Sequence, residues 1–162
     1  MWIFTLKLPQ LLRLKKFQYR MLTQGEIEMC RTVFGSLIQY QKVKIVNQPY
    51  LPWQPNNMFM APEGYIHIRD LHFKKDYSKE NIIYRGIFIH EMTHILQYQK
   101  NINVLLQGAL LQFAHYFSFG LYNPYKYIFT KGKRFSSYNI EQQGDIARDI
   151  YLKKIPNIIL YD

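Results

Sequence analysis

The segment that starts at Ser78 and includes Leu96 constrains the fold of this chain more than any other. Ser78 and Glu80 are placed to start a helix, and the apolar residues that follow occupy much of its circumference: Ile82, Ile83, Ile87, Ile89 and Leu96. A surface helix keeps one broad polar face, whereas a helix that is apolar on most sides needs neighbours on most sides. We therefore expect a long central helix around which the other elements pack.

A shorter helix is predicted nearer the start of the chain. Residues 23–26, Thr-Gln-Gly-Glu, have the spacing of a capping box, and apolar residues then recur at helical intervals until Gly35 offers a stop. Cys30 lies on the apolar face, so we interpret it as a buried structural thiol. Because it is the single cysteine of the chain, an intrachain disulfide and a cysteine-based zinc ribbon are both excluded.

Three short β-prone runs follow at residues 43–46, 58–60 and 65–68, separated by prolines and by the turn Ala-Pro-Glu-Gly. Runs of this kind predict a small antiparallel sheet. A last helix is expected to begin at Ser136 or Ser137 and to run toward Lys153.

These elements together predict an α+β fold, in which the small antiparallel sheet packs on the central helix and on the C-terminal helix. The 162 residues have the length of one domain, and no repeat or low-complexity tract divides them. We therefore expect a single domain over residues 1–162, with residues 1–20 as a basic N-terminal arm.

The chain carries 21 Lys and Arg against 11 Asp and Glu, a net charge of +10. Such an excess attracts anionic partners without choosing among them. Because the basic residues are dispersed, specific nucleic-acid binding is not expected.

The basic arm either contacts a membrane or partner or is a partly ordered start to the domain. It lacks the features of a secretory signal, so we expect the protein to be cytoplasmic as synthesised.

The segment from Asn101 to Tyr125 has no formally charged residue and is rich in Leu, Phe and Tyr. Polar residues recur in it, so it does not have the twenty consecutive apolar residues of a membrane span. We interpret it as a core helix followed by an aromatic loop. An element lying in a membrane interface is the alternative.

The chemistry of the chain is concentrated in the sequence His-Glu-Met-Thr-His at residues 90–94. On a helix His90 and His94 lie one turn apart on the same face, where both rings can bind one Zn²⁺. Glu91 flanks that site and is placed to take a proton from a zinc-bound water, as a general base does. The competing interpretation is a pair of core histidines beside a solvated glutamate.

A catalytic zinc site needs a third protein ligand. One known spacing puts Gly at position 97 and His at position 100, but this chain has Gln97 and Lys100 there. Downstream of His94 the candidates reduce to five side chains, Glu141, Asp145, Asp149, Asp162 and His115.

Glu141 is the favoured third ligand because Asp145 shares its helix face and can hold the outer N–H of a ligating histidine. Glycine is unfavourable inside a helix, and a close approach to the helix that carries residues 90–94 is a physical reason for Gly144. His115 is the alternative ligand. In the competing interpretation Asp145 and Asp149 are surface partners of basic residues nearby.

The motif of residues 90–94 followed by Glu141 and Asp145 resembles the gluzincin branch of the zincin metallopeptidases. More narrowly, residues 89–97 and 138–145, with the early helix, resemble small bacterial Rhs/Vgr-related proteins associated with type VI secretion. The resemblance implies a zincin-like fold in which zinc is bound by His90, His94 and Glu141. It also implies that Glu91 is the general base and that Asp145 accepts a hydrogen bond from a ligating histidine. It also implies export by a type VI secretion system as a route out of the cell.

We therefore expect a zinc-dependent metallopeptidase, acting on protein or peptide and exported as an antibacterial effector. Secretion-system (Rhs/Vgr) components and an immunity protein are the expected partners. The alternatives are a peptidoglycan amide hydrolase and a zinc-stabilised adaptor without catalysis. The stabiliser of the oxyanion stays open among His115, Tyr138, Arg148 and the tyrosines near Asn123, and the strand at 65–68 is a candidate edge for aligning a peptide.

Overall fold

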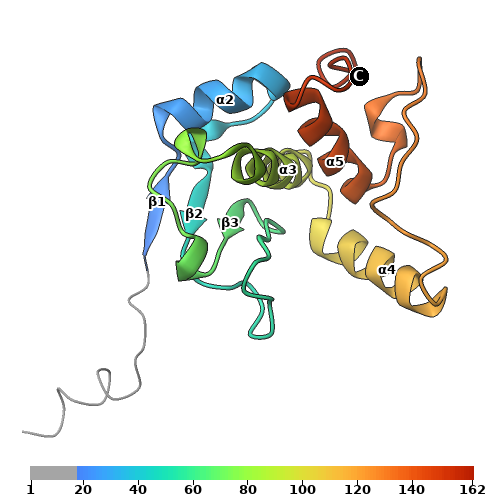
Figure 1. Cartoon of the computed structure of the whole chain (residues 1–162), viewed down its shortest axis with the longest axis horizontal. Coiled ribbons are helices and arrows are strands. Elements are labelled where there is room, and N and C mark those ends of the chain that lie inside the picture. Colours follow the sequence, from blue (N-terminus) through green and yellow to red (C-terminus); the bar gives the residue numbers. More distant parts are fainter. Residues whose placement is uncertain (1–17) are drawn as a thin grey trace, which may run out of the picture.

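The computed structural model describes residues 18–162, and most of the predicted basic arm lies outside them. The chain is α+β, as expected (Figure 1). Within the described residues it has three strands and four α-helices, joined by short 3-10 turns: β1 (Tyr19–Met21), α2 (Gln24–Phe34), β2 (Lys44–Val46), β3 (Tyr65–His67), α3 (Ile82–Gln99), α4 (Val104–Phe117) and α5 (Ile140–Tyr151).

The sheet is mixed, so the prediction of an antiparallel sheet is wrong for one of its two strand pairs. The strand order is β1-β2-β3, with β1 antiparallel and β3 parallel to β2. Residues 47–64 form a crossover long enough to return the chain in the same direction. The predicted strand at 58–60 is reduced to a single bridge between Met60 and His67. Strand β3 is the last strand of the sheet, and its outer edge is paired with Met60 at His67.

Helix α2 starts with the predicted capping box, formed by Thr23 and Glu26, and ends at Gly35. The fully buried carboxylate of Glu26 also accepts two hydrogen bonds from Arg20 of β1 and one from the backbone N–H of Tyr77. This network fixes α2 against β1 and against the turn before α3. Cys30 is completely buried, as predicted, and burial raises its pKa well above the ordinary value.

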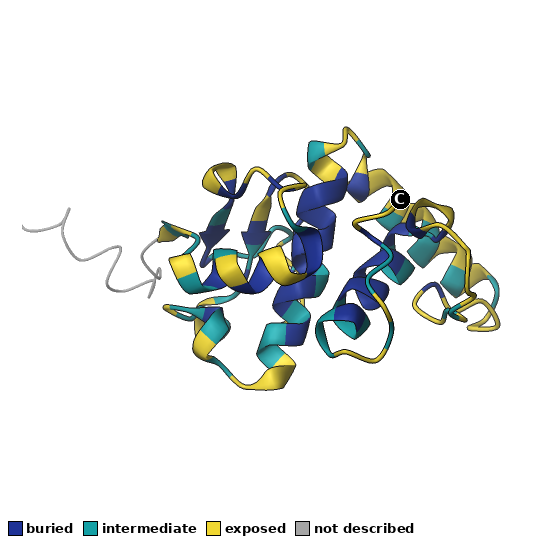
Figure 2. Cartoon of the chain, turned by 90° about the horizontal axis from the view of Figure 1, so that it is seen from above, coloured by how far each residue is buried: buried dark blue, intermediate teal, exposed yellow. Residues whose placement is uncertain are grey.

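Helix α3 is the central helix predicted from the sequence. It lies between the sheet and α5, and Figure 2 shows it as largely buried. The sheet therefore packs on α3, and the prediction that it also packs on the C-terminal helix is wrong, because α3 separates the two. Ile89 and Leu96 are buried, whereas Ile82 and Ile83 in its first turn are exposed. The helix begins later than predicted, because the Ser78 hydroxyl is held by Asp76 in a separate 3-10 turn and the side chain of Asn81 caps α3 instead.

The expectation of a core helix in the uncharged segment is wrong. Helix α4 does form there, but only Val104 within it is buried. The large apolar side chains on its outer side are between 40% and 73% exposed: Leu105, Leu106, Leu110, Phe113, Tyr116 and Phe117. No helix in residues 18–162 is long and apolar enough to cross a membrane. The segment is instead an apolar helix attached along one side to the body of the domain.

Helix α5 begins at Ile140, with Asn139 as its N-cap, and not at Ser136 or Ser137 as predicted. Asn139 forms a capping box with Gln142. Ser136 is occupied elsewhere, since both its backbone N–H and its hydroxyl bond the carboxylate of Asp162. Helix α5 packs along α3, and the core of the domain is formed between these helices, α2 and the sheet.

Candidate metal centre

His90 and His94 lie on the side of α3 that faces α5, with their rings edge to face and 5.0 Å apart between centroids. Glu141, in the first turn of α5, points between them. Its Oε2 atom lies 3.4 Å from Nε2 of His90 and 3.7 Å from Nε2 of His94. One ligand atom from each of the three residues lies within 4.8 Å of the others. The structure thus brings together the three residues predicted as ligands.

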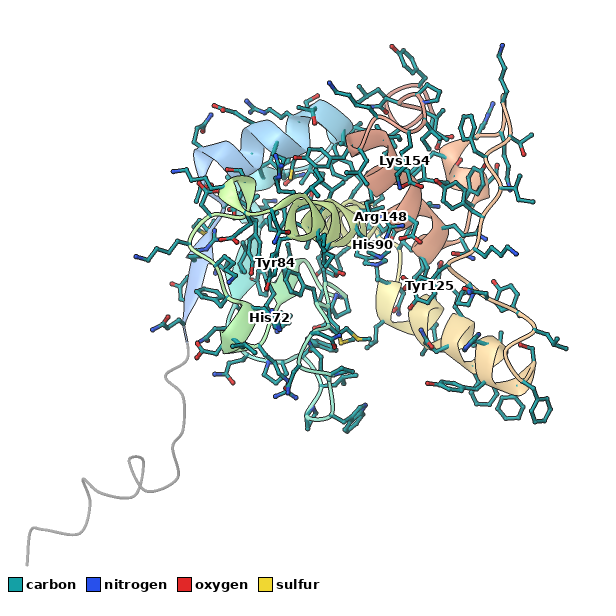
Figure 3. The ribbon with its side chains drawn as sticks, viewed as in Figure 1. His72, Tyr84, His90, Tyr125, Arg148 and Lys154 are labelled. Carbon is teal, nitrogen blue, oxygen red and sulfur yellow. The ribbon has the colours of Figure 1, made fainter. Side chains whose placement is uncertain are left out.

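Asp145, one turn beyond Glu141, binds the outer nitrogen of His90, with Nδ1 3.0 Å from Oδ1. The same oxygen lies 2.8 Å from Nη1 of Arg148. Asp145 therefore combines the predicted contact to a histidine with the competing ion-pair role. Asp149 does not contact a histidine of the centre; it pairs with Lys154 and accepts a hydrogen bond from the Tyr127 hydroxyl. Figure 3 shows His90 and Arg148 where α3 and α5 meet.

Gln97 has a role that the sequence analysis missed. Its Oε1 atom lies 2.8 Å from Nδ1 of His94, and its Nε2 donates to the Ile140 carbonyl and to Gln143 on α5. The signal available in the sequence was its position three residues after His94, on the same face of the helix. Gln97 thus does for His94 what Asp145 does for His90.

These outer bonds determine which ring nitrogens remain for a metal ion. A carboxylate oxygen and an amide oxygen are acceptors, so Nδ1 of His90 and Nδ1 of His94 must each carry the hydrogen. The lone pair of a neutral ring is then on Nε2, the atom that faces Glu141 in both histidines. Two imidazole nitrogens and a carboxylate oxygen form a donor set that suits zinc and related divalent ions. The residues present therefore fit a metal ion.

Gly144 makes the close approach of α5 to α3 possible. A Cβ atom at this position would lie 2.5 Å from Cε1 and 2.6 Å from Nδ1 of His90. No real Cβ contact is that short, so any side chain here would displace the imidazole. The predicted reason for a glycine inside this helix agrees with the structure.

The electrostatics of the centre favour a cation. Burial pushes the pKa of His90 down, but hydrogen bonds to Asp145 and Glu141 outweigh it and raise the pKa to about 10. Burial acts against ionisation of Glu141, yet its bond to His90 and the charge of both rings lower its pKa. An environment that stabilises a positive imidazole between two carboxylates also stabilises a bound metal ion.

Glu91 is buried next to His90 on α3. Burial raises its pKa, while the positive charges of His94 and His90 pull the pKa down. The net shift is upward, so the ionised Glu91 carboxylate is a stronger base than a solvated glutamate.

The other residues predicted as a ligand or as oxyanion donors differ in their surroundings. His115 lies near the end of α4, where its Nδ1 contacts the Tyr122 carbonyl, and it is not part of the ligand group. Tyr138 is buried and donates to the Ile128 carbonyl. Arg148 is engaged by Asp145, whose Oδ1 atom lies 2.8 Å from its Nη1 atom. For Tyr125, burial and then the negative charge of Glu141 raise the pKa to about 12. In Figure 3 Tyr125 lies beside α4, near the labelled His90.

Fold and site together define an α+β domain with a candidate metal centre between two packed helices. The type VI secretion system spike protein VgrG2b of Pseudomonas aeruginosa is 45% identical over 136 residues, which are 83% of this chain and 13% of that protein. The solved effector domain of P. aeruginosa VgrG2b has a TM-score of 0.76 at 40% identity, covering 87% of this chain and 78% of that one. The chain belongs to the family of this effector domain. No protein-family model matches it.

Proposed function

We propose that this domain is a zinc-dependent metallopeptidase that acts as an effector of a type VI secretion system. The observation that carries the proposal is the convergence of His90, His94 and Glu141, with the outer nitrogen of each histidine held by a second side chain. The similarity to the VgrG2b effector domain supports the secretion context. The chain spans 13% of the length of VgrG2b, so delivery and partners are part of the proposal.

His90, His94 and Glu141 would hold the zinc ion. When bound, zinc supplies a Lewis acid that polarises a carbonyl and lowers the pKa of water toward neutrality. The ligand residues contribute one negative charge from Glu141, and the outer bonds of Asp145 and Gln97 keep the rings in one orientation.

Glu91 is the proposed general base, which accepts a proton from the attacking water and passes it to the leaving amine. Its buried position and raised pKa suit both steps, because the group must take up a proton and then release it. Tyr125 is the proposed donor to the developing oxyanion. Its oxygen accepts a hydrogen bond from Gln112, which leaves the phenolic hydrogen free, and its raised pKa keeps that hydrogen in place at neutral pH.

The Tyr65 end of strand β3 is the proposed site for aligning an extended peptide, because Tyr65 is 40% exposed, whereas the backbone of His67 on the same edge is already paired with Met60. The chemistry is the same for a protein and for the peptide bridges of a cell wall. Secretion-system components and an immunity protein are the proposed partners.

The ligand assignment is tested by metal content. Glu141→Ala should lose zinc from the purified protein, whereas His115→Ala should keep it, because only Glu141 lies against both histidines. Zinc retained at full occupancy in Glu141→Ala and lost in His115→Ala would overturn the assignment.

Catalysis is tested with Glu91→Gln, which changes one atom of the carboxylate and leaves the ligands in place. We expect full zinc content and a loss of hydrolysis of an unfolded protein of roughly a hundredfold or more. Glu28→Gln, at an exposed position of α2, is the matched control and should cleave like the wild type. Undiminished hydrolysis in Glu91→Gln would refute the mechanism. Cleavage of purified sacculi but not of unfolded protein would replace the peptidase by a wall amidase.

A further inference from the structure

The segment between α4 and α5 is attached to the start of α5 on both sides of Tyr125. The carbonyl of Pro124 accepts a hydrogen bond from the side-chain amide of Asn139, with 3.0 Å between the two atoms. The carbonyl of Lys126 accepts one from the side-chain amide of Gln142, at 2.9 Å. Pro124 is also buried. The backbone before and after Tyr125 therefore has a fixed place relative to α5.

The same two residues of α5 enclose Glu141 in the sequence. Asn139 is the N-cap of α5, and Gln142 completes the capping box by accepting the backbone N–H of Asn139, at 3.2 Å. Glu141 lies between them in the first turn and points at both histidines of the centre. One capping box thus holds Glu141 and the backbone beside Tyr125 in a single unit.

Gln142 uses both ends of its side-chain amide. Its Oε1 atom accepts the N–H of the N-cap, and its Nε2 atom donates to the Lys126 carbonyl. A glutamate here would complete the capping box as well and would suit the positive end of the helix dipole. Because a carboxylate has no hydrogen to donate, of these two side chains only the amide can also hold the segment. The capping function requires the acceptor alone, and the donor serves the backbone beside Tyr125.

The hydroxyl of Tyr125 is held separately, from α4. Gly108 of α4 lies against the centre, where a Cβ atom would be 4.0 Å from Oε1 of Glu141. Gln112 is one turn further along the same face of α4, and its amide donates to the Tyr125 oxygen at 2.9 Å. This bond uses a lone pair of the phenol and leaves the phenolic hydrogen for another acceptor. Within residues 18–162 no other group takes that hydrogen.

We propose that Gln142 and Gln112 are positioning residues that act through Tyr125. Gln142 fixes the place of Tyr125 beside Glu141, and Gln112 directs the phenolic hydrogen away from its own amide, toward the oxyanion that develops on the substrate carbonyl. The inference rests on the proposed function, in which Tyr125 is the donor to that oxyanion. A donor accelerates the reaction when it already points at the place where charge develops, so both amides contribute to kcat rather than to KM.

Gln142→Glu tests the first amide, because it keeps the cap and removes the donor. We expect kcat for hydrolysis of an unfolded protein to fall roughly tenfold at unchanged KM, because the donor is misplaced. Zinc content and the urea midpoint of unfolding should stay close to those of the wild type. Hydrogen exchange of the backbone around Tyr125 should be faster, in the zinc-free protein as well. Gln24→Glu, the same change at an exposed position in the first turn of α2, is the matched control and should match the wild type in all four measurements.

Gln112→Glu reverses the second hydrogen bond, because the carboxylate accepts the phenolic hydrogen and so removes it from the substrate. We expect kcat to fall roughly a hundredfold or more, as far as in Tyr125→Phe, since an oxyanion donor is lost. Gln112→Leu leaves the hydroxyl free to rotate and should lose less. Gln107→Glu adds the same charge at an exposed position of α4 and should cleave like the wild type.

The last measurement repeats both glutamate substitutions in Tyr125→Phe. If the amides act through Tyr125, neither Gln142→Glu nor Gln112→Glu lowers kcat further in that background. Equal losses with and without the Tyr125 hydroxyl would overturn the inference and leave the metallopeptidase assignment intact, as would a wild-type kcat in Tyr125→Phe or in Gln142→Glu. A wild-type protein that binds zinc and cleaves no unfolded protein would overturn the proposed function, and the inference with it.

Discussion

Replacing Gly144 by alanine is the most direct test of how closely α5 must approach α3. The added Cβ atom would lie 2.5 Å to 2.7 Å from three atoms of the His90 ring. Ordinary contact begins at 3.4 Å, so the ring or the helix has to move by about 0.9 Å. The His90 ring is not a free side-chain end, because Asp145 holds its Nδ1 atom at 3.0 Å and Glu141 lies 3.4 Å from its Nε2 atom.

The loss of stability in Gly144→Ala follows from the contacts of His90 that this movement disturbs. Overpacking of a buried position costs about 1 to 3 kcal/mol, and the alanine offsets up to about 1 kcal/mol of this through its better helix propensity. After the full offset, we expect the free energy of unfolding to fall by up to about 2 kcal/mol. A displaced ligand histidine, with its bond to Asp145 stretched, should weaken metal binding roughly tenfold to a hundredfold.

Gly108→Ala on α4 is the matched control, because it also adds a methyl group beside the centre. There the new Cβ atom would lie 3.9 Å from Ile140 and 4.0 Å from Glu141, both ordinary contacts. This variant should gain about 1 kcal/mol of stability from helix propensity and bind metal as the wild type does. Urea denaturation and competition with a zinc chelator of known affinity measure both quantities. If Gly144→Ala matched Gly108→Ala in stability and zinc affinity, the close approach inferred for α5 would be refuted.

Three further changes test other parts of the structure. Gln97→Leu should weaken zinc binding roughly tenfold or more in the same chelator competition, because His94 loses the partner of its outer nitrogen; unchanged affinity would remove Gln97 from the centre. Glu26→Gln should lower the free energy of unfolding by about 3 kcal/mol in urea denaturation, since it leaves Arg20 without its buried carboxylate. Burial lowers the pKa of His67, so the unfolded chain takes up the proton first as the pH falls below about 6.5. Between about pH 7 and pH 5 the wild type should therefore lose more stability than His67→Gln, and equal losses would contradict that shift.

The metal centre was accessible from the sequence because its parts lie on two helices with fixed spacing. His90 and His94 are one turn apart on α3, and Glu141 and Asp145 are one turn apart on α5. Each pair shares a face whatever the tertiary structure, so the sequence has only to indicate that the two faces meet. The scarcity of acidic residues downstream of His94 narrowed that choice to a few side chains. The identity of the metal and catalysis remain predictions.

The direction of strand β3 and the exposure of α4 were not accessible in the same way. Strand direction depends on how the chain crosses between β2 and β3, and residues 47–64 hold no periodic pattern that reveals the crossover. The composition of α4 is largely apolar, which is typical of both a buried helix and one that meets lipid. The start of α3 was displaced for a local reason, because Asp76 engages Ser78 and Asn81 is left to cap the helix.

Helix α5 supplies the third ligand residue, Glu141, and the partner of His90, Asp145, so the metal site depends on how this helix is held against α3. Glu141 and Asp145 are its charged contacts to α3, Gly144 allows the approach, and the Ile140 carbonyl in its first turn accepts from Gln97. A bound ion would add a further link between α3 and α5 by joining His90 and His94 to Glu141. Since such a link exists only in the folded chain, a bound ion would stabilise the packing of α5 on α3, and that packing would in turn strengthen ion binding by the same free energy.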